Sequence, residues 1–218
     1  MRRARAGRLE PVLLVAEHQS AGRGRLGRGW DSDSGDSLTF SLGLPLAPAD
    51  WSGLSLAVGV SLAESLHARI RLKWPNDLWL DDRKLAGILI ETAAAGESRQ
   101  QRYAVVGVGI NLAQRPQAGL ATAPAWLREV LPACQPDAVL LRVVPSLVQA
   151  IQAFERAGFA PFKARFDARD ALRDRALLLS DGTVGTGRGT TDRGGLRVQT
   201  AGGLTTVTSS EVSVRPCP

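Results

Sequence analysis

Hydrophobic and polar positions along the chain follow patterns that predict both strands and helices. The apolar run PVLLVA, residues 11–16, predicts a short buried strand, and the alternation in SLTFSLGL, residues 37–44, predicts a half-buried one. Apolar residues at helical spacing predict one long central helix within 51–70. A second amphipathic helix is predicted over 138–157, with Leu141 on its buried side.

The segments around these helices predict further strands. LWL, residues 78–80, and KLAGILIETA, residues 84–93, flank a DDR turn as in a hairpin, and a strand follows within 103–112. The mixture predicts an α+β fold with a helix-backed mixed sheet. The C-terminal part is rich in Gly, Thr and Val with paired turn residues, which predicts a small all-β module and a division into domains 1–168 and 169–218.

Composition places broad limits on the class of protein. A hydrophobic content of 44% is ordinary for a soluble globular chain, and we expect no membrane span and no signal peptide, hence a cytoplasmic protein. Cys134 and Cys217 have no paired spacing that would suggest a disulfide or a metal site. The net charge of +6 suits ATP, an acidic protein partner or nucleic acid, and does not choose among them.

The stretch AGRGRLGRGW, residues 21–30, places three arginines among four glycines. Glycine lets backbone N–H groups approach a ligand, and arginine presents a planar fork that matches carboxylate or phosphate oxygens. The stretch therefore indicates an anion-binding loop. It matches neither a phosphate-binding Walker loop nor a dinucleotide fingerprint, and alone it is equally typical of a solvated basic loop or a nucleic-acid-binding segment.

Two further motifs follow in the chain, RLKWPNDLWLDDRKLAGILIE at 71–91 and VVGVGINL at 105–112. In this order the three stretches resemble the catalytic domain of the biotin protein ligases, strongly over 13–112 and more faintly to the C-terminus. Lipoate and octanoate ligases or transferases share that architecture and a similar lysine, but GRGR together with KWPND favours biotin.

The resemblance implies a catalytic domain like that of the class II aminoacyl-tRNA synthetases, followed by a small barrel of the Src-homology-three type. It implies ATP-dependent joining of biotin to a lysine of a biotin carboxyl carrier protein through biotinyl-5′-adenylate, with Mg²⁺, in a monomer or homodimer. Family members begin with a Ser-Thr-Asn turn and a helix, neither of which precedes Val12. Because no helix-turn-helix pattern precedes it either, we expect no DNA binding.

The resemblance also assigns roles to residues of this sequence. Lys84, Arg23 and Arg25 would be catalytic, and Asp77 would lie near Mg²⁺. Residues that would contact biotin are Gln19, Gly22, Arg23, Lys84, Gly87 and Ile88. Residues that would contact ATP or the adenylate are Arg25, Arg28, Asn111, Arg115 and Trp126.

Each of these residues also has an ordinary structural interpretation. Lys84 alone would be taken for a solvated hairpin lysine, Asp77 for a turn former and Trp126 for a core aromatic. Trp30 is interpreted as an anchor of the Arg/Gly loop rather than as a ligand contact. A nucleic-acid-binding module is the rival of another class, but aromatic residues make up only 5% of the chain, and none follows Phe166 to stack on bases.

Overall fold

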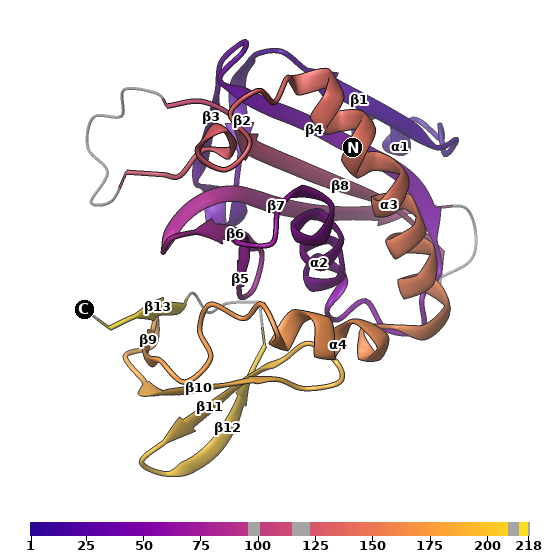
Figure 1. The fold of residues 1–218 in the computed structure, drawn as a ribbon. Coiled ribbons are helices and arrows are strands. Elements are labelled where there is room, and N and C mark those ends of the chain that lie inside the picture. Colours follow the sequence, from indigo (N-terminus) through magenta and orange to yellow (C-terminus); the bar gives the residue numbers. More distant parts are fainter. Residues whose placement is uncertain (96–100, 115–122, 209–213, 218) are drawn as a thin grey trace.

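The computed structural model of the protein describes residues 1–95, 101–114, 123–208 and 214–217, and its largest element is a six-stranded sheet (Figure 1). In spatial order its strands are β1 (Val12–Ala16), β4 (Ser37–Leu46), β8 (Arg102–Asn111), β7 (Arg83–Ala94), β6 (Asp77–Leu80) and β5 (Arg71–Lys73). The α+β class is confirmed. All ladders within the sheet are antiparallel, and parallel pairing in the described residues occurs as isolated bridges, Leu72 with Asp170 beside this sheet and Arg173 with Gly187 further along the chain.

Helices cover one face of this sheet (Figure 1). They are α2 (Leu54–Leu66) and α3 (Pro136–Ala157), with α4 (Ala160–Asp167) packed against both; short 3₁₀ turns are η1 (Arg25–Gly27) and η2 (Leu127–Glu129). Helix α1 (Arg2–Arg5), which precedes Val12 although no helix was expected there, packs on the opposite face, where Ala4 contacts Tyr103 and Ala95. The predicted central helix is α2, shorter than 51–70 because Gly53, at φ 84°, precedes its first turn. Gly59 lets α2 approach the sheet, since a Cβ there would lie 3.2 Å from Leu72.

Helix α3 is turned differently from the sequence prediction. Its buried side carries Val139, Val143 and Leu147, whereas Leu141 is 75% exposed. The buried side packs on α2 and α4. Among the described helices, α3 passes a test of length and composition for a membrane span, a test that core helices of globular proteins also pass.

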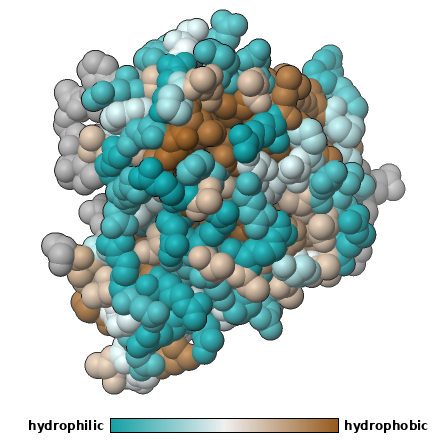
Figure 2. Space-filling view, in the orientation of Figure 1, coloured by the Kyte–Doolittle hydropathy of each residue, from teal (hydrophilic) through white to brown (hydrophobic). Residues whose placement is uncertain are grey.

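The prediction of a buried strand over 11–16 is wrong in its burial. Strand β1 forms at the edge of the sheet, paired only with β4 among the described strands, and Leu13, Leu14 and Val15 are 39–52% exposed. Figure 2 shows an apolar patch in the region where Figure 1 places β1, β4 and the start of α3.

The C-terminal residues form a second, five-stranded sheet. In spatial order its strands are β12 (Gly203–Val207), β11 (Leu196–Thr200), β10 (Val184–Thr190), β9 (Ala176–Leu179) and β13 (Val214–Pro216). This sheet docks on the first part of the chain through a buried hydrogen bond, in which Trp74 Nε1 donates to the Gly194 carbonyl at 3.0 Å. An ion pair of 2.6 Å between Arg193 and Asp50 lies beside it.

The connection from α4 to the C-terminal sheet pairs with β5 and carries a buried carboxyl group. Leu72 N donates to Arg169 O at 2.8 Å, and Ala171 N donates to Leu72 O at 2.9 Å. Asp170 between them is 2% exposed; its Oδ1 accepts from Leu172 N, and its Oδ2 is buried without a partner in the described structure. Burial raises the pKa of Asp170 to about 6.

This raised pKa predicts a pH-dependent stability. The unfolded Asp170 carboxyl ionises near pH 4, whereas the folded one resists ionisation until about pH 6, so folding loses about 3 kcal/mol across this window and the loss persists above it. Asp170→Asn removes the ionisation and keeps an acceptor for Leu172. Urea unfolding should show the variant more stable than wild type at pH 7.5, by a margin that shrinks towards pH 4.5. A margin independent of pH, or the same trend in the exposed control Asp192→Asn, would refute this account.

Candidate active site

A cavity of about 330 Å³ opens between the six-stranded sheet and the ribbon formed by β2 (Gln19–Arg23) and β3 (Gly29–Ser32). Its floor includes Gly87 and Gly109 on the neighbouring strands β7 and β8. Five cationic side chains and two carboxylates line it, namely those of Arg23, Arg25, Arg28, Lys73, Lys84, Asp77 and Glu91. This excess of cations suits an anionic ligand.

The ribbon holds the Arg/Gly stretch in a tight turn over the cavity. Gly22 pairs with Trp30, and Gly24 N donates to Arg28 O at 2.7 Å. The turn between the strands passes through Leu26 and Gly27, both at positive φ. Glycine is required at position 22 because a Cβ there would lie 2.1 Å from the backbone oxygen of Trp30.

The three arginines of the ribbon differ in their surroundings. Arg25 is half-buried, and its Nη1 donates to Asn76 Oδ1 at 3.3 Å. Burial lowers the pKa of the Arg25 guanidinium, while the nearby Asp77 carboxylate acts in the opposite direction. Arg23 and Arg28 are exposed, and Arg23 lies 3.9 Å from Glu91. Arg25 is therefore fixed in the wall, whereas the other two are freer to meet a ligand.

The KWPND turn connects β5 to β6 and links several parts of the site. The Asn76 side-chain amide donates to Ile88 O at 2.7 Å, and Asn76 O accepts from Ile88 N at 2.9 Å. Asn76 is thus a bridge between strand β7 and Arg25 as well as a turn residue. The Ile88 side chain packs near Gly59 of α2, so this residue faces the helices and offers the cavity side mainly its backbone.

Lys84 lies at the start of β7 with its ammonium group in the cavity. Its Nζ is 2.8 Å from Asp77 Oδ1 and 5.9 Å from the centre of the Trp30 ring. Gly87 leaves room for it, since a Cβ there would lie 3.2 Å from Nζ. Lys84 is therefore a cation held in place by Asp77, and an anionic ligand would share it with that carboxylate.

Trp30 lines the cavity, whereas the sequence interpretation made it an anchor of the loop. Its indole lies against Gly109, where a Cβ would be 2.3 Å from the ring, and its Nε1 is buried without a hydrogen-bond partner in the described structure. The sequence signal for this placement was the pair of glycines at 107 and 109, which project to the same face of β8. Two alternating glycines in a central strand indicate that something large lies on them.

Most of the residues predicted from the sequence meet at this cavity. Gln19, Arg23, Arg25, Arg28, Asp77, Lys84, Gly87 and Ile88 line it. Gly22 shapes the ribbon above it. Asn111 and Trp126 lie beside the cavity wall instead, and Asn111 Nδ2 donates to the backbone oxygens of Lys84 and Ala125 at 3.3 and 3.1 Å. Arg115 lies outside the described residues.

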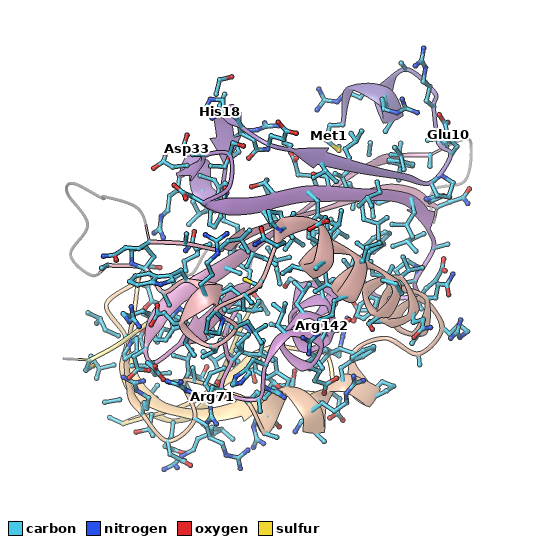
Figure 3. All side chains as sticks on the ribbon, turned by 45° about the horizontal axis from the view of Figure 1, so that its top comes forward. Met1, Glu10, His18, Asp33, Arg71 and Arg142 are labelled. Carbon is cyan, nitrogen blue, oxygen red and sulfur yellow. The ribbon has the colours of Figure 1, made fainter. Side chains whose placement is uncertain are left out.

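His18, to which the sequence assigned no catalysis, directly precedes the ribbon. Figure 3 shows His18 and Asp33 close together at the outer end of the ribbon, where the ring nitrogen Nδ1 is 3.3 Å from the carboxylate. His18 does not belong to the cavity lining. Among the described residues no group of three or more His, Cys, Asp or Glu side chains could hold a metal ion.

Comparison with known proteins agrees with this geometry. Residues 9–111 match the biotin/lipoate A/B protein ligase family. The chain is 34% identical to a biotin–(acetyl-CoA-carboxylase) ligase of Paracoccus denitrificans, over 96% of this chain and 95% of that protein. The chain belongs to this family. The match over residues 9–111 includes the ribbon, the KWPND turn, Lys84 and strand β8, which together surround the cavity.

Two other relatives extend the comparison. The bifunctional ligase/repressor BirA of Escherichia coli is 36% identical over 92% of this chain, and the chain spans 65% of the length of that relative. The solved structure of a biotin protein ligase from Aquifex aeolicus in complex with biotin and ATP superposes with a TM-score of 0.79 at 29% identity, covering 94% of this chain and 89% of that one. The fold of the family therefore extends over nearly the whole chain.

Proposed function

We propose that this protein joins biotin to a lysine of a biotin carboxyl carrier protein at the expense of ATP. The observation that carries the proposal is Lys84, held in a glycine-floored cavity under an arginine ribbon. Family membership restricts the acid to biotin or lipoate, and the Aquifex aeolicus relative was solved with biotin and ATP. The GRGR and KWPND motifs at this cavity favour biotin.

The chemistry proceeds in two steps. A carboxylate oxygen of biotin attacks the α-phosphorus of ATP, pyrophosphate leaves, and biotinyl-5′-adenylate forms. The uncharged amine of the carrier lysine then attacks the acyl carbon, AMP leaves, and the amine loses a proton. The first step brings two anions together, so fixed cations at the meeting point would stabilise its transition state.

The described side chains divide this work as follows. Lys84 lies between the carboxylate and the α-phosphate, Arg25 is fixed in the wall, and the exposed Arg23 and Arg28 reach the phosphates. Gln19 and the small residues Gly22 and Gly87 receive the biotin ring and its chain, with the backbone of Ile88 beneath. Asn111 and Trp126 serve the adenylate, and the family resemblance gives the same role to Arg115, which lies outside the described residues.

Mg²⁺ would accompany ATP in this scheme. The ion is normally held by one or two carboxylates together with substrate phosphates and water, and it neutralises phosphate charge. Asp77 is a cavity carboxylate that fits this description, although Lys84 engages one of its oxygens. Asp77 could thus contribute one ligand to a Mg²⁺ ion that arrives with the nucleotide. The described residues offer too few ligands to hold a metal ion without the nucleotide.

We also propose two finer features of the molecule. Its division lies between residues 168 and 169, just after α4, and the five C-terminal strands form a small barrel of the Src-homology-three type. The carrier is an acidic domain of a biotin-dependent carboxylase, whose charge complements the net charge of +6. Docking of this sheet against Trp74 supports the view that the two domains work as a unit.

The proposal is tested by isotope exchange between pyrophosphate and ATP, with biotin and lipoate offered separately. Exchange that depends on biotin is expected, followed by transfer of labelled biotin to a purified carrier domain. Exchange with lipoate alone would change the substrate, and exchange with neither acid would refute the ligase function.

Replacing Arg25 with alanine should make the adenylate leak from the enzyme. Arg25 ties the ribbon to Asn76, so its loss opens the cavity on the ribbon side. Free biotinyl-adenylate in the medium should rise about tenfold, in keeping with the loss of one charged hydrogen bond. The control is Arg142→Ala on the exposed surface of α3 (Figure 3). Free adenylate at the wild-type level in the Arg25 variant would contradict a sealing role.

A further inference from the structure

A cluster of interacting side chains lies next to Lys84, outside the cavity lining. It joins Arg83 at the start of β7 to the segment around η2. Arg83 forms an ion pair with Glu129, its Nη1 donates to Pro124 O at 3.4 Å, and its guanidinium lies 5.5 Å from the centre of the Trp126 ring. Glu129 in turn accepts from Trp126 N at 2.9 Å.

This cluster is well shielded from solvent and charged. The side chains of Arg83 and Glu129 are 27% and 21% exposed. Burial acts to raise the pKa of Glu129, but the hydrogen bonds from Arg83 and from the Trp126 backbone outweigh it, so the pKa lies below its ordinary value. The pair is therefore ionised at neutral pH, and shielding makes it stronger than an exposed ion pair.

Backbone contacts connect the same segment to Lys84. Ala125 N donates to Lys84 O at 2.9 Å, and Asn111 Nδ2 bridges the carbonyls of Lys84 and Ala125. Trp126 follows Ala125 directly and is only partly buried. The indole is thus set at a fixed position relative to Lys84, with one face occupied by a guanidinium.

We propose that Arg83, oriented by Glu129, is a positioning residue for the nucleotide base. This inference deepens the proposed function and rests on it. Arg83 covers one face of the Trp126 indole and prevents its rotation, which leaves the opposite face to stack on a planar purine. A cation over one face of an indole is a favourable arrangement, and stacking of a base on an aromatic ring tolerates it. Arg83 directly precedes Lys84 in the chain. It therefore fixes the position of the base relative to Lys84, the residue that meets the α-phosphate.

The test separates base binding from phosphate binding. In Arg83→Met the KM for ATP in pyrophosphate exchange should rise roughly 10- to 100-fold, the range expected for one stacked base, with the KM for biotin nearly unchanged. Inhibition by adenosine should weaken to the same extent, and inhibition by tripolyphosphate should not. Arg83→Lys, which keeps a cation over the ring, should recover part of the loss. Glu129→Gln, close in shape to the native residue, should reproduce the defect in a folded protein.

A second ion pair, which joins the same hairpin to the C-terminal part of the chain, provides a matched control. Arg175 pairs with Asp82 in the β6–β7 turn at 2.6 Å, so Arg175→Met removes an ion pair of similar type and should leave the KM for ATP unchanged. Equal weakening of adenosine and tripolyphosphate in the Arg83 and Glu129 variants, or an unchanged KM for ATP, would overturn the positioning role. Absence of exchange in the wild-type protein would instead overturn the proposed function, and the role of Arg83 with it.

Discussion

Lys84→Ala is expected to reduce biotin-dependent pyrophosphate exchange about 100- to 1,000-fold, the usual cost of removing one preorganised donor from a developing anion. The side chain is 43% exposed, so thermal unfolding should change little. Exchange rates at saturating biotin and ATP measure the effect. Lys163→Ala on α4 removes a lysine far along the chain and should keep normal exchange. Wild-type exchange in the Lys84 variant would remove this residue from the mechanism.

The structure sharpens this expectation through Asp77. Removal of Lys84 leaves a carboxylate that is only 15% exposed without its ammonium partner, facing incoming anions. Part of the loss should therefore be repulsion. Adding Asp77→Asn to Lys84→Ala should recover some affinity for ATP measured without Mg²⁺, when Asp77 has no metal ion to hold, and should not restore the full rate. If the double variant binds ATP no better than the single one, the Asp77 carboxylate does not oppose the ligand.

Gly22→Ala is expected to lower biotin affinity about 10- to 100-fold. This corresponds to about 1–3 kcal/mol, the usual free-energy cost of fitting an extra methyl group into a tightly packed place, here the ribbon. The added Cβ would meet a backbone oxygen, that of Trp30 at 2.1 Å, which cannot rotate away as a side chain could. Strands β2 and β3 must separate, and Trp30 moves with them. Because the ribbon is a separate two-stranded sheet, the core should be unaffected.

Titration calorimetry with biotin and thermal unfolding together check this prediction. Gly29→Ala is the matched control, since it lies on the paired strand and a Cβ there meets nothing within 4 Å. It should fold and bind biotin like the wild type. Equal affinities for the Gly22 and Gly29 variants would show that the ribbon accommodates a side chain and that close approach is not the reason for glycine.

Much of the architecture could be predicted because it depends on local patterns. The β6–β7 hairpin follows from two apolar runs around Asp81 and Asp82, which both adopt the positive φ of a tight turn. Helix α2 follows from its apolar spacing. The site could be predicted mainly because three motifs of a known family occur in order, which placed Arg25 and Lys84 together before any distance was known.

The burial of individual residues could not be predicted, because it depends on neighbours that are distant in the sequence and absent from the local hydrophobic pattern. The run at 11–16 is as apolar as a central strand, yet β1 lies at the edge of the sheet, and only the order of strands determines that. Leu141 fell on the wrong side because several apolar residues of α3 allow two helix orientations. Trp30 and Arg83 make their contacts with residues 79 and 46 positions away, and such long-range contacts have no signature in a local window.

The hydrogen bond from Trp74 to Gly194 restricts how the two parts of the molecule can diverge. The KWPND turn begins with an indole whose buried N–H finds its acceptor in the C-terminal sheet, and a Cβ at position 194 would lie 2.8 Å from the Gly53 Cα. A chimera that took its C-terminal sheet from another protein would have to supply both a carbonyl and a glycine at that point. The two parts must therefore match in sequence at this point, and the C-terminal sheet helps to hold the KWPND turn that lines the cavity.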